Sequence, residues 1–515
     1  MKRAVYAVGG LALPPEATAY GLARYSRSAE PAKKTFTDMA EKILGGGEAM
    51  KKFFEVFYFQ YGHASIADLA HVGMAIENIS IVSAIEVVDE PLWDGQERST
   101  RYQKFSAEAV HTPAPVAKSA RLTKQYKTGI SYLMNEYQKL NTDLLGEVRA
   151  KNPLPKNYPE GAYKAATRAR AFDMARYLLP LGTLTSVGQI TSGRTLEKMI
   201  SRLFSNQYSE VQAVAADIKK ACQSKTFNPF SAEIQTELRK LEKLPNTDKT
   251  TKAAIKRLQK ILQPSAPVPS LIKYTAPQEY LMKTQQELKK IAAEYLPRFK
   301  VDSSYDVQAY GQLDPLVEAV CTVLYGVTHY SFGQIYEQVR SWPKKRLQAV
   351  YTAATKYRGP HDELLRSLDT HSLILDVLMD VGGYRDFHRH RRTMQVAQDY
   401  TFQHGYDVHP ELASYGGLYP YQLAMDTITE TLKKVESVNH EAAVYLMPLG
   451  FKRRALFKMS WNELDYIGKL RTGAGRHLSY WKIALRMVEE AAKISPERAQ
   501  LIQTKPLSMD SVYER

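Results

Sequence analysis

Apolar positions along the chain follow two patterns, one helical and one continuous. Residues 172–179 and 195–204 place apolar side chains three or four positions apart, and this spacing predicts helices. Residues 53–59 and 81–88 are instead apolar runs with aromatic or β-branched side chains, which is typical of strands in a sheet. The pattern therefore predicts an α+β fold (mixed α/β), in which small sheets pack against helices.

The middle of the chain has a different composition. Residues 233–263 are rich in Lys, Glu and Gln, which indicates a helical spacer, and residues 264–270 (PSAPVPS) predict a stiff extended linker. A further helical pattern runs from Gln278 to Leu296. We therefore expect a first domain over residues 1–230, a spacer and linker over 231–305, and a second domain over 306–515.

Two short segments of the first half recur in the second half, in the same order. Residues 20–26 (YGLARYS) are similar to 325–331 (YGVTHYS), and residues 177–182 (YLLPLG) are similar to 445–450 (YLMPLG). Such internal repetition is the sequence signature of a duplicated unit. The chain is therefore predicted to hold two copies of one domain in tandem.

Composition narrows the classes of protein to consider. The 515 residues are 44% hydrophobic, which excludes disordered and collagen-like chains. Lys and Arg number 70 against 54 Asp and Glu, and the net charge of +16 favours anionic partners such as nucleotides, nucleic acid or acidic cofactors. The two cysteines, Cys222 and Cys321, cannot build a disulfide framework or a cysteine-based zinc cluster. We expect a cytoplasmic protein without a signal peptide, a spanning helix or a metal site.

The segment 95–105 (GQERSTRYQKF) carries the groups that hold a phosphate. Two arginines supply guanidinium forks, Ser99 and Thr100 supply hydroxyls, and the first glycine allows close approach of the backbone. Such a site would suit a nucleoside monophosphate. The alternative is a helix start, in which a serine caps the first turn and Glu97 pairs with Arg101.

The segment 385–392 (RDFHRHRR) is a dense basic cluster around one aromatic residue. Such a cluster can neutralise a pyrophosphate or stabilise an anionic, reduced flavin ring. The alternatives are a solvated face and a nucleic-acid patch, which basic runs form more often. The segment alone does not decide between them.

Other candidate residues carry weaker signals. His63 and Ser65 follow a glycine after an aromatic run, although a lone histidine is more often a satisfied structural residue. Single basic side chains on predicted helices, which are usually solvent-facing, are Arg176, Arg194, Arg202, Arg471 and Arg476. The sequence has no Walker loop, nucleophile elbow or His-Glu-x-x-His helix, so P-loop, serine-hydrolase and common zinc-protease chemistry have no motif support.

Together these segments resemble the flavin-dependent thymidylate synthases, the ThyX family, in both halves of the chain. That family is marked by Arg-His-Arg, seven further residues and a serine within Glu-x-Ser-x-Arg-Tyr. Residues 97–102 (ERSTRY) are similar to the second part, but Asp89-Glu90-Pro91 stands where Arg-His-Arg is expected. Residues 389–391 (RHR) are similar to the first part, but Asp399 and Thr401 replace the serine and the arginine. The two halves together carry each part of the motif once.

The resemblance implies one composite site shared by the two halves. The residues that it assigns to the substrate are Glu97, Ser99, Thr100, Arg101, Arg176 and Arg471, of which Arg176 and Arg471 are the catalytic candidates. Those that it assigns to the cofactor are Ser26, His63, Ser65, Arg194, Arg389, His390 and Arg391. Two chains would form a homodimer, a pseudo-tetramer with half the usual number of complete sites.

The activity implied by the resemblance is the reductive methylation of dUMP to dTMP through FAD, with NADPH and methylenetetrahydrofolate as co-substrates. No protein nucleophile attacks the pyrimidine in that family, so the protein contributes positioning and electrostatic stabilisation. The departures at Asp399 and Thr401 leave open a ThyX-like flavoenzyme with a different pyrimidine nucleotide as its substrate. The basic composition leaves open an inactive ThyX-like protein that binds nucleic acid, with salt-sensitive binding and no bound flavin.

Overall fold

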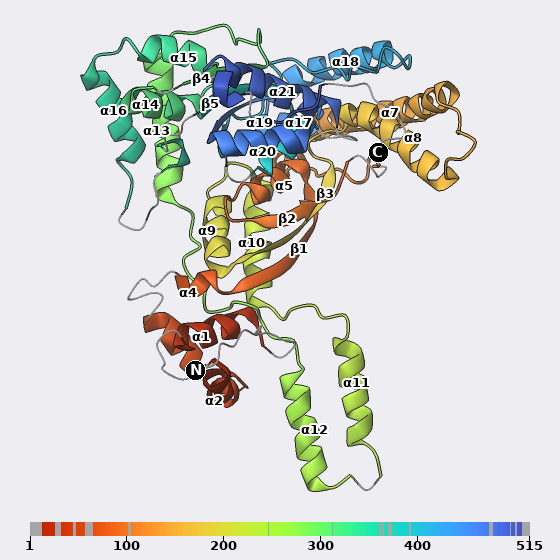
Figure 1. Ribbon diagram of the computed structural model, residues 1–515, viewed down its shortest axis with the longest axis vertical. Coiled ribbons are helices and arrows are strands. Elements are labelled where there is room, and N and C mark those ends of the chain that lie inside the picture. Colours follow the sequence, from red (N-terminus) through yellow and green to blue (C-terminus); the bar gives the residue numbers. More distant parts are fainter. Residues whose placement is uncertain are drawn as a thin grey trace.

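The computed structural model describes residues 13–25, 32–44, 48–56, 65–100, 105–245, 247–311, 313–359, 362, 365–368, 373–390, 393–472, 477–494, 496–499 and 502–506. Its strands form two small antiparallel sheets that pack against helices (Figure 1). This architecture confirms the predicted α+β fold. Within the described part of the chain, no helix combines the length and the apolar character needed to cross a membrane.

In each half, helices alternate with the strands of one sheet. Those of the first half are α1 (Pro15–Tyr25), α2 (Ala32–Leu44), α3 (Glu48–Phe53), α4 (Ser65–Asp68), β1 (His71–Ser80), α5 (Ile81–Val88), β2 (Asp94–Glu97), α6 (Ala114–Ala117), α7 (Ala120–Lys151), α8 (Glu160–Ala175), the 3₁₀ turn Arg176–Leu178, β3 (Leu184–Ser192), α9 (Gly193–Phe204) and α10 (Ser209–Gln223). Those of the middle are α11 (Ser231–Glu242), α12 (Lys249–Ile261) and α13 (Glu279–Tyr295). Those of the second half are β4 (Val307–Tyr310), α14 (Pro315–Tyr325), α15 (Phe332–Val339), α16 (Lys344–Thr355), the 3₁₀ turn Arg366–Leu368, β5 (Leu373–Asp380), α17 (Val381–His388), β6 (Met394–Ala397), α18 (Leu418–Glu436), α19 (His440–Leu446), β7 (Lys452–Met459), α20 (Trp461–Arg471), α21 (Leu478–Ala492) and α22 (Pro496–Ala499).

The two sheets are built from the same succession of elements. In the first the strand order is β1, β3 and β2, and in the second it is β4, β5, β7 and β6. β1 and β5 run directly into α5 and α17, and β3 and β7 run into α9 and α20. Each of these four helices is capped by a side chain at the end of its strand, namely Ser80, Asp380, Ser192 and Ser460. The matching caps support the prediction of two copies of one domain.

Residues 81–88, which the apolar run assigned to a strand, form helix α5 instead. That prediction was wrong because seven of the eight residues are buried, so no polar face interrupts the run to reveal a helical period. The helix starts where Ser80 Oγ accepts a hydrogen bond from the backbone N–H of Ser83 (3.0 Å). In the other run, α3 ends at Phe53 and residues 57–59 lie outside the described residues. The helical spacing over 172–179 and 195–204 is confirmed by the end of α8, the 3₁₀ turn after it and α9.

The repeated segments 177–182 and 445–450 bind each other through their backbones. Pro180 and Pro448 form an antiparallel bridge. The hydrogen bonds beside it come in equivalent pairs: Leu181 N to Met447 O (2.6 Å) with Leu449 N to Leu179 O (2.8 Å), and Gly182 N to Tyr445 O (2.7 Å) with Gly450 N to Tyr177 O (2.9 Å). Exchanging the two halves reproduces each of these contacts, so the two segments are related by a local two-fold axis.

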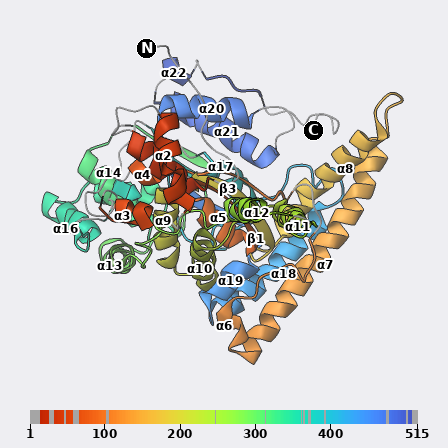
Figure 2. The ribbon, with the colours of Figure 1, turned by 90° about the horizontal axis from the view of Figure 1, so that it is seen from below.

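One hydrophobic core joins the two halves. Its buried side chains come from α5, α7 and β3 of the first half and from β5, β7, α18 and α21 of the second. Along one edge, α7 packs against α8 and also against α18 of the second half (Figure 2). A smaller core lies among α13, α14, α15 and α16. Because both halves contribute to the larger core, they are packed as one body.

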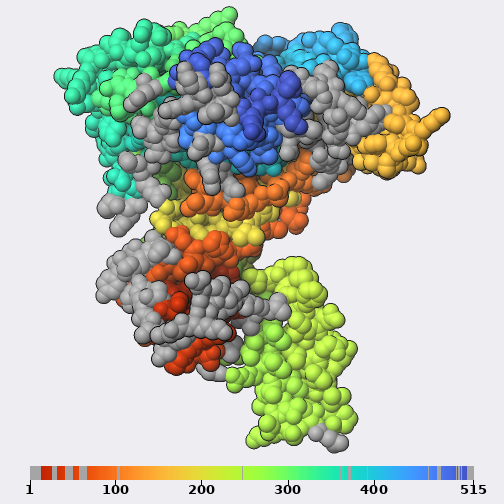
Figure 3. All heavy atoms as spheres, in the orientation of Figure 1, coloured from red at the N-terminus to blue at the C-terminus, as the bar shows by residue number. Residues whose placement is uncertain are grey.

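The middle of the chain divides between a projection and the two cores. Helices α11 and α12 form a hairpin that extends away from the body (Figures 1 and 3). The proline-rich segment that follows packs against the first half, where Val268 is buried and its N–H donates to the carbonyl of Cys222 (3.3 Å). Helix α13 instead joins the smaller core through Leu288. The predicted helices of the spacer are therefore present, and the segments after them extend the two halves.

Glycine is required at the contact between the repeated segments. A Cβ on Gly182 would lie 2.8 Å from the carbonyl oxygen of Tyr445, and one on Gly450 would lie 3.1 Å from that of Tyr177. We expect Gly182→Ala and Gly450→Ala each to lower the free energy of unfolding by about 1–3 kcal/mol, measured by urea denaturation. Gly146 on α7 is the control, because nothing lies within 4 Å of its added Cβ. Alanine there should raise stability by about 0.5–1 kcal/mol, and equal effects at all three positions would contradict the close contact.

The carboxyl of Glu16 makes stability depend on pH. Glu16 is 1% exposed, and its Oε1 accepts a hydrogen bond from the N–H of Ser270 (2.9 Å). Burial raises the pKa of Glu16 from 4.5 to about 7. The folded state therefore binds a proton that the unfolded state releases over this window, and stability falls as the pH rises through it. Glu16→Gln should gain on the order of 3 kcal/mol over the wild type near pH 8 and nothing near pH 4. Denaturation across this range checks it, and a difference that does not change with pH would be the contrary result.

Candidate active site

A cavity of about 230 Å³ lies between the two halves of the chain. The first half lines it with Gln96, Glu97, Arg98, Ser99, Thr100 and Arg176. The second half lines it with Gly382, Arg385, Asp386, Arg389, Arg471 and Tyr480. Five of these side chains are arginines and two are carboxylates. The cavity is therefore suited to an anion.

The elements around the cavity fix the directions of these side chains. Strand β2 pairs with β3, with Glu97 opposite Val187, and the chain leaves the sheet directly afterwards. Helix α17 begins at Asp380, whose Oδ1 accepts a hydrogen bond from the N–H of Gly383 (2.7 Å). Arg385 and Arg389 follow one helical turn apart, so both lie on the side of α17 that faces the cavity.

A buried ion pair joins the two halves across the cavity. Arg385 Nη2 donates to Glu97 Oε2 at 2.8 Å, and the two side chains are only 6% and 5% exposed. The second carboxylate oxygen of Glu97 and the Nε of Arg385 have no hydrogen-bond partner among the described residues. Removing either charge would leave the other buried and uncompensated, which is the costly way to break such a pair. The pair therefore holds β2 and α17 together at the cavity.

Arg176 brings an incompletely satisfied guanidinium to the same cavity. It is 2% exposed, and Nη1 lies 3.5 Å from the hydroxyl of Thr100. Its Nε and Nη2 have no hydrogen-bond partner within the described residues. Burial and the neighbouring Asp407 raise the pKa of Asp380, and the Arg176 charge opposes this rise. Buried donors of this kind are normally satisfied, so Arg176 is arranged for an acceptor that the protein does not supply.

Arg389, His390 and Arg471 form a connected group on the second half. Arg389 Nη2 donates to the carboxylate of Asp386, and Arg471 Nη2 donates to the backbone carbonyl of the same residue. Arg471 Nε donates to His390 Nε2 at 2.8 Å. Burial lowers the pKa of His390 to about 4, so the ring is neutral near pH 7 and can accept this bond. His390 thereby orients Arg471 toward the cavity and does not itself line it.

The structure brings together most of the described residues that the sequence singled out. Glu97, Ser99, Thr100, Arg176, Arg389 and Arg471 line one cavity, and His390 contacts Arg471. Arg194 lies elsewhere, because its Nη1 pairs with Asp68 Oδ2 at 3.1 Å and it does not line this cavity. Ser65 begins α4, but its side chain is not described. Ser26, His63, Arg101 and Arg391 lie outside the described residues.

Six lining residues were not among the predicted site residues, namely Gln96, Arg98, Gly382, Arg385, Asp386 and Tyr480. Arg98 and Arg385 belong to the two basic segments, and the one-turn spacing of Arg385 and Arg389 was the signal that both face one ligand. Tyr480 on α21 belongs to no motif. It reaches the cavity through the packing of α21 against α17, which the sequence does not display.

Comparison with known proteins adds a family to this geometry. The chain matches the family described as thymidylate synthase complementing protein over residues 12–226 and 339–497. It is 25% identical to a UPF0159 protein of Chlamydia pneumoniae, over 86% of this chain and 78% of that protein. It is 24% identical to a UPF0159 protein of Thermoplasma acidophilum, over 94% of each chain. Since the family match spans most of both halves, the chain belongs to the thymidylate synthase complementing protein (ThyX) family.

Proposed function

We propose that the chain is a flavin-dependent thymidylate synthase with one composite site built from both halves. The reaction is the reductive methylation of dUMP to dTMP, with methylenetetrahydrofolate and NADPH as co-substrates and FAD as cofactor. The observation that carries this proposal is the cavity in which arginines from both halves present donor atoms that lack partners within the described residues. Such an arrangement needs an anionic ligand of nucleotide type.

The first half would bind the phosphate of dUMP. Arg176 offers Nε and Nη2, and the hydroxyl of Thr100 lies beside its guanidinium. Ser99 and Arg98 line the same wall. Bidentate guanidinium contacts and hydroxyl donors are the groups that fix a phosphate in position. Glu97 is held by Arg385, so its role is to position β2 and Arg385 beside the substrate.

The second half would hold the flavin and the pyrimidine base. Arg389 lines the cavity, and its Nε has no hydrogen-bond partner among the described residues, so it fits an anionic ring or a pyrophosphate. When bound, FAD supplies the hydride chemistry of the reductive step. Arg471 is held by His390 and by the carbonyl of Asp386, and a guanidinium fixed in this way can orient the base and polarise one of its carbonyls.

Neither cysteine offers a nucleophile to the pyrimidine. Cys222 and Cys321 are fully buried, and neither lines the cavity. Burial raises the pKa of Cys222 to about 12 and also raises that of Cys321. Thiols in such surroundings stay protonated near neutral pH and are inert. This supports a reaction that depends on positioning and electrostatics, with no covalent adduct to a cysteine.

Binding of nucleic acid is a second candidate function, and helix α12 favours it. Its basic residues are Lys249, Lys252, Lys256, Arg257 and Lys260, and the helix has no acidic residue. The four lysines lie along one exposed face of the hairpin. This function predicts binding that falls steeply with salt and a protein without flavin. The donors left open in the cavity favour the enzyme instead.

Two substitutions test the division of the site between the halves. Arg389→Ala should abolish flavin retention, because it removes the guanidinium on the cofactor side. Ser99→Ala should keep the flavin band and weaken dUMP binding by roughly 10- to 100-fold, since it removes one hydrogen bond to a charged group. Visible absorption spectra of the protein with FAD, before and after addition of dUMP, measure both effects. Formation of dTMP, assayed beside other pyrimidine nucleotides, then identifies the substrate.

Arg168→Ala is the matched control for these variants. Arg168 is an exposed residue of α8 and does not line the cavity, so this variant should behave as the wild type. If Arg389→Ala and Ser99→Ala both form dTMP at the wild-type rate, the composite site is wrong. A colourless protein that takes up no FAD would move the assignment to nucleic-acid binding.

A further inference from the structure

A second cavity, of about 380 Å³, is lined in part by counterparts of the first site with the halves exchanged. Asp89 after α5 corresponds to Arg389 after α17, and Asp399 after β6 corresponds to Ser99 after β2. The correspondence follows the matching caps of α5 and α17 and the shared strand order. A cavity therefore lies at each of two places that the local two-fold axis relates.

The second cavity lacks the arginines of the first. The positions equivalent to Arg98, Arg176, Arg385, Arg389 and Arg471 hold Gln398, Val444, Ile85, Asp89 and Leu203. Arg202 and Arg453 line the second cavity at other positions, so the cluster of five arginines that lines the first cavity is absent. These residue differences make the two cavities chemically different, although the strands and helices around them are equivalent.

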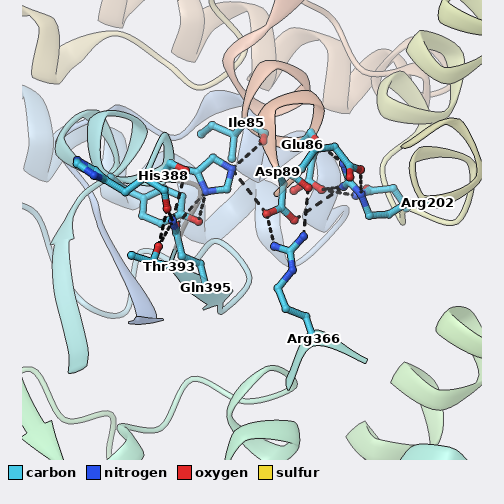
Figure 4. Close-up of polar contacts among 12 residues, drawn as sticks. Ile85, Glu86, Asp89, Arg202, Arg366, His388, Thr393 and Gln395 are labelled. Atoms are coloured by element: carbon cyan, nitrogen blue, oxygen red, sulfur yellow. Dashed lines mark hydrogen bonds and ion pairs between the residues drawn. The ribbon is translucent and has the colours of Figure 1, made fainter. Parts of the chain in front are cut away.

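The main charged side chains at the second cavity are paired within the protein (Figure 4). Arg366 Nη1 lies 2.6 Å from Asp89 Oδ1, and Arg202 Nη1 lies 3.9 Å from Asp89 Oδ2. Although burial opposes it, these two arginines hold the pKa of Asp89 well below its usual range. Asp399 is paired with His440 at 3.2 Å. The carboxylates of Asp89 and Asp399 in the lining also oppose the entry of an anionic ligand.

The buried atoms that lack hydrogen-bond partners at this cavity belong mostly to neutral groups. Thr284 Oγ1, Thr328 Oγ1 and His329 Nδ1 have none among the described residues, and Thr284 is only 1% exposed. Burial lowers the pKa of His329, so its ring is neutral near pH 7. Arg453 Nη1 also lacks a partner, while its guanidinium is fixed over the ring of Tyr400 (4.0 Å to the ring centre). The cavity thus offers fixed hydrogen-bonding groups, with the guanidinium of Arg453 among them and without the arginine cluster of the first cavity.

The rest of the wall is apolar. Its aliphatic side chains come from α13, α14, the segment after α14, and β6, and they are Leu281, Leu288, Val323, Val327 and Val396. Aliphatic walls with a few placed polar groups are typical of sites for small ring compounds, and the volume lies in the range of such sites. Figure 4 shows the ion pairs of Asp89, Arg202 and Arg366 as a group.

We propose that the second cavity binds a small uncharged heterocycle, of the class of a nucleobase or a nucleoside without phosphate. Ring carbonyls accept hydrogen bonds from Arg453 and the threonine hydroxyls, and a ring N–H donates to His329 Nδ1. A 5′-phosphate is disfavoured, because the carboxylates of Asp89 and Asp399 line the cavity and the arginine cluster of the first cavity is absent. This inference goes beyond the reaction proposed for the first cavity and rests on different residues.

Calorimetric titration of the full chain with thymidine tests the proposal. Thymidine should bind at one molecule per chain, with the same affinity in Arg176→Ala, which alters only the first cavity. Thr284→Val keeps the side-chain shape and removes one hydroxyl, so it should weaken thymidine binding about 5-fold. Leu281→Trp, at the half-exposed edge of the wall, should block binding by filling the cavity. Urea denaturation, which does not depend on the first cavity, should show that both variants are folded.

Three results would overturn the proposal. The first is no heat of binding with thymidine at millimolar concentration. The second is binding that is lost in Arg176→Ala and unchanged in Thr284→Val, because it would belong to the first cavity. The third is a second molecule of dUMP bound per chain as tightly as thymidine. Failure of flavin or dUMP binding at the first cavity would leave these readings unaffected, so the two proposals are tested separately.

Discussion

The backbone contact between residues 177–182 and 445–450 is the constraint on which the rest of the structure depends. The same segments also receive the first turns of two helices, since Val82 N donates to Leu181 O (3.4 Å) and Gly382 N donates to Leu449 O (3.3 Å). Helices α5 and α17 are therefore anchored at equivalent points. Because each helix ends beside a cavity, one contact between glycines and carbonyls sets the place of both cavities at once.

The two equivalent frames carry different charges, and the difference lies in a few side chains. At the first cavity Arg385 and Arg389 of α17 face a wall from the other half, and the donors of Arg176 stay open. At the second cavity Asp89 takes the equivalent place and is paired with Arg366. The fold is shared, so the chemistry of each cavity has to be read from its own residues. Because the fold and the lining side chains vary separately, one chain can keep an anion site at one cavity and lack it at the equivalent cavity.

Much of the candidate site could be predicted from the sequence, because short motifs carry it. Glu97, Ser99, Arg176, Arg389 and Arg471 all lie in or near repeated or basic segments, and the structure gathers them around one cavity. Parts of the fold could not be predicted, because local pattern was a poor guide there. The run 81–88 is buried on all sides and shows no helical period, although it is a helix.

The second cavity could not be predicted from the sequence, for a different reason. Thr284, His329 and Arg453 come from segments far apart in the chain, and of these three only His329 lies in a segment that the sequence singled out, the repeat 325–331. Their proximity depends on α13 packing beside α14, which is a property of the smaller core. Arg194 shows the converse limit, since the resemblance assigns it to the cofactor but its side chain is paired with Asp68.

The ion pair between Arg366 and Asp89 also has a consequence for the history of the chain. With an arginine at position 366, an arginine at position 89 would set two guanidiniums against each other in a partly buried place. An arginine at position 89 would therefore need a second change at position 366, because the first change alone would be unfavourable. The residue at position 89 of the first half is therefore constrained by the residue at position 366 of the second half, so the two copies no longer vary independently.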